Sequence, residues 1–374
     1  MESAGRTPRL TTLAGAAVLL GLAGSCGSDP APELRLRVAT YNTSLYRDER
    51  GALAAAVRAG DPQAADVAAA LLAAHPDIVL LNEIDADAVE AFATSIPGQP
   101  YPHRFVPPSN TGHPTGIDLD RDGITTGPGD ARGFGRYPGQ YGMALLSRFP
   151  IESTRCFGDV LWASLPWATL PDDASTDAPA DYYSPQAQAA LPLSSKNHCD
   201  VVVRSPLGRV HLLISHPTPP AFDGPEDRNG HRNRDEVLFW VHHIDTLPAA
   251  EHFVVLGDLN ADPTDGGAPA GITALLAHPR IQDPKPTSEG AASASRTQKQ
   301  ANTTHLGDPR LDTADFSDDT VGNLRVDYVL PSRTLRVLSS AVQWPAAVER
   351  TVRAEPSDHH LVWVDVATKS VPKR

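Results

Sequence analysis

Seven short apolar segments recur between residues 34 and 366, each with the length of a β-strand, and this succession limits the folds open to the chain. The first segment, 34–42, alternates apolar residues with Arg35 and Arg37, the period-2 pattern of a strand buried on one face. The second, 77–83, is a continuous apolar run that is typical of a central strand. The other five segments are 141–147, 210–215, 253–257, 326–330 and 361–366.

Two further segments carry the signals of α-helices. Asp61 and Pro62 suit a helix N-cap and first turn, and Pro76 ends the helix that they begin. In 234–247 the apolar residues are spaced by three and four positions, which predicts an amphipathic helix. Strands and helices are therefore mixed along the chain, and the sequence predicts an α/β fold.

The composition indicates one large globular domain. No internal repeat or change of composition divides residues 34–367, so we expect 168–192 and 285–304 to be loops or insertions and 368–374 to be a tail. With 41% hydrophobic residues the chain can build a sizeable core, which excludes general disorder. The formal net charge of −13 argues against a protein that coats nucleic acid, because neutralising phosphates takes an excess of Lys and Arg.

The amino end has the features of an export signal, which we assign to residues 1–26. Basic residues precede the apolar run 10–22, which is too short to cross a bilayer. Residues 23–26 (AGSC) have the pattern of a lipobox, which predicts lipidation of Cys26, with 27–33 as a tether. The alternative is an ordinary secretory signal cut after Ser25. Both interpretations predict an extracytoplasmic protein, and with lipidation the membrane contact would be the lipid anchor alone.

Cys156 and Cys199 are the two cysteines that remain once the export signal is set aside. In an oxidising compartment an even pair favours one disulfide, which would close a loop around much of the Pro- and Asp-rich middle of the chain. The alternative is two unpaired residues of the core.

Polar residues follow the ends of several of the predicted strands. Strand ends are rigid positions from which an α/β scaffold presents functional groups. Carboxylates and amides hold Mg²⁺ or Mn²⁺, and His and Asp side chains can handle the proton of an attacking water, as metal-assisted phosphoester cleavage requires. The residues are Asn42, Glu83, His216, Asp258, Asn260, Asp327, Asp358 and His359.

In their order along the chain these segments resemble the endonuclease/exonuclease/phosphatase superfamily, which has the fold of deoxyribonuclease I. The resemblance covers about residues 34–367 and implies a four-layer α/β/β/α sandwich with the site at one edge of two packed sheets. The segments HPTPP, DGPEDRNG and GNLRVDYVLPS together are similar to a bacterial secreted lipoprotein subgroup. The motifs that carry the resemblance are VATYN (38–42), DIVLLNE (77–83), ALLSRFPI (144–151), SH (215–216), GDLNAD (257–262), RVDYVL (325–330) and SDH (357–359).

The resemblance also implies roles for these residues. Glu83 would be the main metal ligand, with Asn42 and Asp358 nearby. His359 would contact the scissile phosphate and be oriented by Asp327. Asp258 would orient or deprotonate the attacking water, and Asn260 would hold phosphate oxygens.

His216 matches a second histidine, which acts on the leaving oxygen in deoxyribonuclease I-like members. The chain departs from the family here, because Gly142 stands about where those enzymes carry a Glu partner for this histidine. The competing interpretation of His216 is a structural histidine in a tight turn before Pro217.

Basic residues near these motifs are candidates for substrate binding, and we single out Arg148, Arg228 and Arg232. Arg228 and Arg232 could clamp a substrate phosphate. They could instead pair with the acidic residues of the same loop and only make it rigid.

An independent motif, DLDRDG, occupies residues 118–123. Asp118, Asp120 and Asp122, followed by Gly123, form the first half of a calcium loop, although Gly129 stands where the ligand Glu would be. The sequence thus predicts a possible Ca²⁺ site, against the alternative of a solvated acidic turn.

Taken together, the sequence predicts an exported, divalent-metal-dependent phosphoesterase that cuts phosphodiesters or phosphomonoesters. Its substrate would be a phosphorylated small molecule, a lipid or a nucleic acid, and no obligate protein partner is evident. A nuclease would need a basic groove, and a lipid phosphodiesterase would need exposed apolar loops, for which 162–167 is the candidate. The alternative outside enzymes is a surface-binding module that kept the fold.

Overall fold

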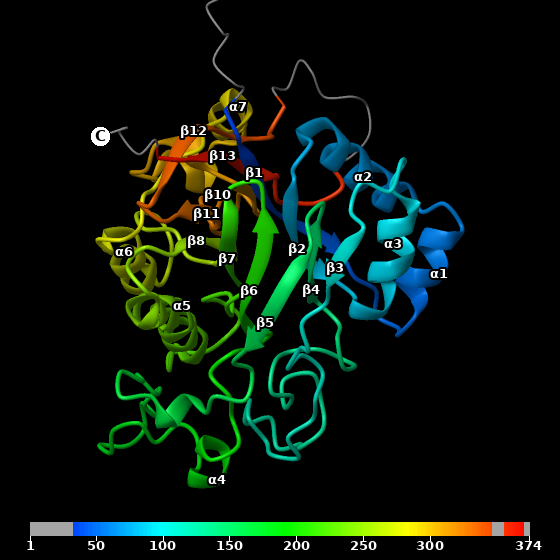
Figure 1. The fold of residues 1–374 in the computed structure, drawn as a ribbon. Coiled ribbons are helices and arrows are strands. Elements are labelled where there is room, and N and C mark those ends of the chain that lie inside the picture. The colour runs from blue at the N-terminus through cyan, green and yellow to red at the C-terminus, as the bar shows by residue number, and fades with distance from the viewer. Residues whose placement is uncertain (1–32, 346–354, 370–374) are drawn as a thin grey trace, which may run out of the picture. The chain divides into compact units, whose positions relative to one another are not determined.

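Two β-sheets lie face to face in the computed structural model, which describes residues 33–345 and 355–369 (Figure 1). The expected export signal with Cys26 lies outside the described residues, as do most of the tether and the tail. The first sheet has the order β12-β13-β1-β2-β4-β3 and the second has the order β11-β8-β7-β6-β5.

The strands of the first sheet are β1 (Leu36–Leu45), β2 (Ile78–Ile84), β3 (His103–Phe105), β4 (Gly142–Ser147), β12 (Leu335–Val342) and β13 (Val362–Thr368). Those of the second sheet are β5 (Ile151–Cys156), β6 (His198–Ser205), β7 (Gly208–Ser215), β8 (His252–Asp258) and β11 (Asp327–Pro331). A two-stranded ribbon joins β9 (Ala314–Asp315) to β10 (Asn323–Leu324).

Helices cover the outer face of each sheet (Figure 1). The first sheet is covered by α1 (Ala52–Arg58), α2 (Pro62–Ala74) and α3 (Val89–Ser95), and the second by α5 (Arg228–Thr246) and α6 (Pro269–Ala277). The remaining helices are α4 (Pro185–Gln188), α7 (Glu289–Gln298) and the 3-10 turns Ala86–Ala88, Trp162–Ser164, Gln300–Thr303 and Pro309–Leu311.

The alternation of apolar residues along the strands builds these layers. In β1, Val38 packs between the two sheets, whereas its neighbour Ala39 packs under the helices. In β2, Ile78 likewise packs between the two sheets and Val79 packs under the helices. Since successive strand side chains point to opposite faces, both faces of the first sheet are buried and the four-layer α/β/β/α architecture is confirmed.

The observed elements extend and correct the predicted ones. Helix α2 begins as expected, with the Asp61 carboxylate accepting the backbone N–H of Ala64 at 2.9 Å. Helix α5 begins at Arg228, six residues earlier than predicted, and α7 lies inside the segment 285–304 that was expected to be a loop. Strands β3, β5, β6 and β12 were not predicted, because their apolar patterns are short or interrupted by polar residues.

Cys156 and Cys199 form a disulfide. They lie opposite each other on the antiparallel strands β5 and β6. The disulfide interpretation is therefore the one observed, and the bond closes the loop-rich segment between these strands.

No helix in the described ranges is long and apolar enough to span a membrane.

Candidate active site

The predicted site residues meet because the strands that carry them end at one edge of the two sheets. In the first sheet, β1 and β2 run parallel, so Asn42 and Glu83 lie near the same edge. In the second, β7 and β8 run parallel and deliver His216 and Asp258. Antiparallel β11 begins where β8 ends, with Asp327 opposite Asp258.

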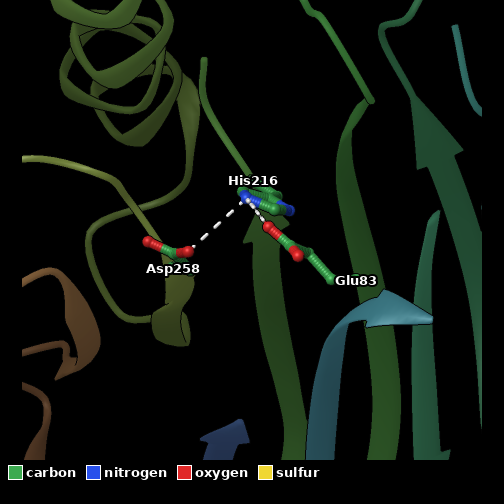
Figure 2. Close-up of side chains that lie close together, drawn as sticks. All are labelled: Glu83, His216 and Asp258. Atoms are coloured by element: carbon green, nitrogen blue, oxygen red, sulfur yellow. Dashed lines mark ion pairs between the residues drawn. The ribbon is translucent and has the colours of Figure 1, made fainter. Parts of the chain in front are cut away.

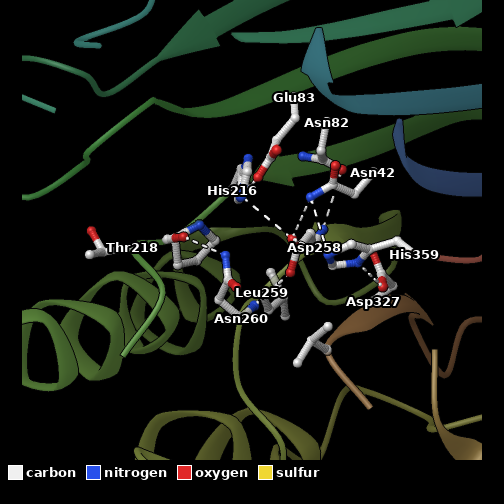
Figure 3. Close-up of polar contacts among 12 residues, drawn as sticks. Asn42, Asn82, Glu83, His216, Thr218, Asp258, Leu259, Asn260, Asp327 and His359 are labelled. Atoms are coloured by element: carbon white, nitrogen blue, oxygen red, sulfur yellow. Dashed lines mark hydrogen bonds and ion pairs between the residues drawn. The ribbon is translucent and has the colours of Figure 1, made fainter. Parts of the chain in front are cut away.

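Glu83 sits in a local irregularity of its strand. The register of β2 shifts between Asn82 and Ile84 against β4, and the backbone of Glu83 has φ 54°. A left-handed backbone is unfavourable for a residue with a Cβ and tends to occur where function requires it. The bulge turns the Glu83 side chain toward the residues of the second sheet, as Figure 3 shows.

Asp258 is the centre of the site. Its Oδ2 accepts a hydrogen bond from Asn42 Nδ2 at 2.9 Å and lies 3.8 Å from His359 Nε2. The residue is 1% exposed, and burial raises the pKa of Asp258 to about 7, with the charge of His359 opposing the rise and that of Asp327 adding to it. A carboxylate with this pKa can exchange a proton near neutral pH.

His359 and Asp327 form a buried pair. His359 Nδ1 donates to Asp327 Oδ2 at 2.8 Å, because a carboxylate can only accept. Burial lowers the pKa of His359, but the negative charges of Asp327 and Asp258 outweigh this effect and raise it to about 10. His359 is therefore a cation at neutral pH and turns Nε2 toward Asp258.

His216 lies across Asp258 from His359. Its Nε2 is 3.5 Å from Asp258 Oδ2 and 3.9 Å from Glu83 Oε1. The side chain is 1% exposed, and neither ring nitrogen has a hydrogen-bond partner in the part of the chain that the structure describes. Burial, reinforced by the positive charges of Lys196 and His359, holds the pKa of His216 well below its ordinary value, so this imidazole is neutral.

Asn260 and Asp358 complete the predicted set. Asn260 has φ 49°, its backbone N–H donates to Asp258 Oδ1 at 2.9 Å, and its side-chain amide donates to the carbonyl of Pro217 at 3.1 Å. Asp358 is exposed, and its carboxylate accepts a hydrogen bond from Ser44 Oγ at 3.2 Å. Burial raises the pKa of Glu83, and the negative charge of Asp358 adds to the rise. The role of Asp358 as a metal ligand beside Glu83 stays a prediction.

Three residues that support the site were not singled out from the sequence. Asn82 links the sheets, because its Oδ1 accepts the backbone N–H of Asp258 at 3.3 Å. Thr313 Oγ1 donates to Asp327 Oδ2 at 2.8 Å and so fixes the partner of His359. The fully buried Glu236 accepts the N–H of Ser195 at 2.7 Å and that of Thr218 at 2.6 Å. The sequence could have indicated Asn82, because it directly precedes the candidate ligand Glu83. Thr313 and Glu236 lie in no motif that would have marked them.

The three candidate arginines do not form a phosphate clamp. Arg232 is 8% exposed and donates to the carbonyls of Leu193 at 2.8 Å and Pro192 at 2.9 Å, so it is a structural residue. Arg228 contacts Glu226, which supports the alternative of a rigid loop. Arg148 follows β4 and lies 3.5 Å from Asp77, at the end of β2 opposite to Glu83, so it is removed from the candidate site.

The predicted calcium loop brings its carboxylates together. One oxygen atom each from Asp118, Asp120 and Asp122 lies within 4.8 Å of the others. The buried Asp130 accepts the N–H of Leu119 at 2.8 Å, and its pKa is raised by burial and by the three neighbouring carboxylates. The loop is thus an acidic cluster, and it lies apart in sequence from the strand-end residues.

The tryptophans considered as a lipid-contacting loop are packed against the protein. Trp162 is 1% exposed and donates through Nε1 to Asp235 Oδ2 at 2.8 Å. Trp167 stacks on His242 with ring centroids 3.8 Å apart. The packing interpretation is therefore the one observed.

Two facing sheets that end in carboxylates, amides and two histidines at one edge define a class of α/β-sandwich phosphoester hydrolases. Residues 39–359 match the model of the endonuclease/exonuclease/phosphatase family, and the chain belongs to this family. A comparison with curated proteins gives no match.

The chain is similar to several solved structures. The chain is similar to an endonuclease/exonuclease/phosphatase from Beutenbergia cavernae, with 19% identity and a TM-score of 0.53 over 90% of this chain and 72% of that one. A family protein from Leptotrichia buccalis matches with 14% identity and a TM-score of 0.49 over 90% of this chain and 100% of that one. TDP2 from D. rerio, solved with a single-strand DNA product, matches with 12% identity and a TM-score of 0.49 over 89% and 99%.

Proposed function

We propose that this protein is a divalent-metal-dependent phosphoesterase that hydrolyses phosphodiester or phosphomonoester bonds. The observation that carries the proposal is the arrangement around Asp258. A carboxylate whose pKa is raised to about 7 lies 3.8 Å from a histidine that is a cation at neutral pH. A base and a positive charge side by side are what hydrolysis of an anionic ester requires.

The residues at the site fit a hard divalent cation. Glu83, Asn42 and Asp358 would hold Mg²⁺ or Mn²⁺, since carboxylate and amide oxygens are the preferred ligands of these ions. The Glu83 side chain is 26% exposed, and burial raises its pKa although the positive charges of His359 and Lys196 oppose the rise. A bound cation would favour its ionised form. When bound, the ion neutralises negative charge on the phosphate and polarises its P–O bonds.

The side chains of the site would carry out the proton transfer and stabilise the developing charge. Asp258 takes one proton from the attacking water while the water oxygen forms a bond to phosphorus. The P–O bond to the leaving group breaks with its electron pair on the leaving oxygen, which His216 would face. His359, held by Asp327, supports the charge that develops on the phosphate oxygens, and Asn260 orients them.

The test is turnover of a small substrate panel with Mg²⁺, Mn²⁺ and Ca²⁺. Bis-p-nitrophenyl phosphate, p-nitrophenyl phosphate, plasmid DNA and sphingomyelin separate the ester classes. Asp258→Asn should lower kcat at least ~100-fold, the lower range for loss of a general base. Asp245→Asn, a matched change at a carboxylate that is 69% exposed, should leave turnover unchanged. Absence of metal-dependent turnover on all four substrates would favour the binding-module alternative.

A phosphorylated small molecule is the substrate class that we favour over nucleic acid or lipid. The net charge of −13 opposes a polyanion, and two of the three candidate arginines are engaged within the fold, by carbonyls or by Glu226. Trp162 and Trp167 are packed against the protein, so the candidate loop 162–167 does not present its tryptophans to a lipid surface.

We further propose that the protein is exported and lipid-anchored through Cys26, on the sequence pattern of residues 1–26. Metabolic palmitate labelling of the wild type and of Cys26→Ser tests this, and an unlabelled wild type would contradict it. The loop of Asp118, Asp120 and Asp122 supports a separate Ca²⁺ ion in that compartment. Calorimetric titration with Ca²⁺ against Asp120→Asn tests the ion.

A further inference from the structure

His216 is a fully enclosed imidazole with no hydrogen-bond partner among the described residues. It is 1% exposed, and both Nδ1 and Nε2 are without a partner. Buried polar atoms in folded proteins are nearly always satisfied, so an orphaned pair of ring nitrogens calls for an explanation. Figure 2 shows that Nε2 points between the carboxylates of Glu83 and Asp258.

The distances exclude direct hydrogen bonds as that explanation. His216 Nε2 lies 3.5 Å from Asp258 Oδ2 and 3.9 Å from Glu83 Oε1, beyond the usual range of an N–H···O bond. Ligand atoms bound to one zinc-sized ion at about 2.1 Å are themselves ~3–4 Å apart. The three atoms lie within 4.8 Å of one another, so they can close on a common ion with small shifts.

We propose that Glu83, His216 and Asp258 form a divalent-metal position with one nitrogen and two oxygen ligands, which selects Mn²⁺, Co²⁺ or Zn²⁺ over Mg²⁺ and Ca²⁺. Imidazole nitrogen is a common ligand of Zn²⁺ and Co²⁺ and is accepted by Mn²⁺ beside carboxylates, whereas Mg²⁺ and Ca²⁺ take oxygen. The inference rests on the proposed function in one respect, because both bring a cation to Glu83. It differs in the residues that join Glu83, which are His216 and Asp258 in place of Asn42 and Asp358, and in the class of metal. With Asp258 as a ligand, that residue would orient the attacking water on the ion.

The architecture supplies rigid supports for this position. Asp258 is held by Asn42 Nδ2 at 2.9 Å and by the backbone N–H of Asn260 at 2.9 Å. Glu236 holds the chain just after His216, since its Oε2 accepts the N–H of Thr218. Glu83 is fixed by the bulge in β2. Ligands that are positioned before the metal arrives lose little freedom when they bind it.

The experiment detects which atoms coordinate the metal ion and does not depend on enzymatic turnover. Mn²⁺ is added to the metal-free protein, and electron spin echo envelope modulation detects any nitrogen bound to the ion. We expect nitrogen coupling in the wild type, its loss in His216→Gln, and at least a ~10-fold weaker Mn²⁺ affinity in that variant with Mg²⁺ affinity nearly unchanged. His242→Gln is the matched control, since His242 is an exposed residue of α5 stacked on Trp167, and it should retain the coupling.

His359→Gln separates the two histidines of the site. Coupling that survives His216→Gln but is lost in His359→Gln would overturn the proposal, as would a wild-type spectrum with no nitrogen. If His216→Gln does not fold, the wild-type and His359→Gln spectra together still decide. A protein that shows the nitrogen ligand but no hydrolysis would contradict the proposed function and leave the metal position standing, and the reverse result would do the opposite.

Discussion

His359 Nδ1 lies 2.8 Å from Asp327 Oδ2, and both side chains are almost completely buried. The two residues are separated by 32 positions in the chain and reach each other from the start of β11 and the segment before β13. Because Thr313 occupies the same carboxylate oxygen, this geometry holds the His359 ring with Nε2 toward Asp258.

We predict that Asp327→Asn lowers the pKa of His359. The negative charges of Asp327 and Asp258 raise the pKa of His359 to about 10 from an ordinary value of 6.5. Protonated His359 therefore stabilises the folded protein fully below about pH 6.5, and this contribution is lost as the pH rises through 10. In the variant His359 should titrate several tenths to two units lower, since the Asp258 charge remains. Proton–nitrogen NMR of metal-free protein measures this, and an unchanged pKa would remove Asp327 from the pair.

Glu236→Gln should disturb the site from a distance. The carboxylate accepts the N–H and the hydroxyl of Ser195 and the N–H of Thr218, whereas the amide of Gln offers one acceptor oxygen. At least one buried donor would be orphaned, at a cost of about 1–3 kcal/mol in the free energy of unfolding. Urea denaturation measures the loss, and Glu49→Gln, at an exposed glutamate, is the control that should show none.

Reduction of the Cys156–Cys199 disulfide should destabilise the protein. The bond closes a loop with a sequence separation of 43, for which the chain-entropy model gives about 4 kcal/mol. Unfolding in urea with and without dithiothreitol gives the difference. A Cys156→Ser, Cys199→Ser protein should resemble the reduced wild type and be insensitive to dithiothreitol, and equal stability of all forms would contradict the prediction.

Asp312→Asn should stabilise the protein at alkaline pH. Asp312 is 8% exposed, and burial together with the charges of Asp262, Asp265 and Asp308 raises its pKa to about 8. Between about pH 4 and pH 8 such a carboxyl group is protonated in the folded state and ionised in the unfolded state. The free energy of unfolding of the protein therefore falls as the pH rises through this range. The variant escapes this loss, so its advantage at pH 9 should be about 2 kcal/mol or more.

The comparison for Asp312 is made by urea denaturation in EDTA at pH 4 and pH 9. The two proteins should be nearly equal at pH 4. A variant that is less stable than the wild type at pH 9 would mean that the ionised carboxylate is favourably bound in the folded state.

The order of the motifs along the chain, through their resemblance to the endonuclease/exonuclease/phosphatase family, predicted the architecture and placed the candidate site at one edge of the sheets. Alternating apolar residues mark a strand buried on one face, and a continuous apolar run marks a strand buried on both faces. Polar residues that follow such strands lie at the strand ends. The resemblance placed Asn42 and Asp258 in one site, and the structure joins them by a hydrogen bond across 216 positions of the chain. The disulfide was one of two interpretations that the sequence left open.

The tertiary structure decided what depends on contacts between distant segments. The local sequence around an arginine does not show whether its guanidinium binds a ligand or the protein's own carbonyls. In the structure Arg232 donates hydrogen bonds to the carbonyls of Leu193 and Pro192, which gives it a structural role. Thr313 and Glu236 support the site through hydrogen bonds to Asp327 and Thr218, which lie 14 and 18 positions away and leave no periodic pattern in the sequence. The position of His216 between two carboxylates also depends on the packing of the two sheets, because Glu83 belongs to the first sheet and Asp258 to the second.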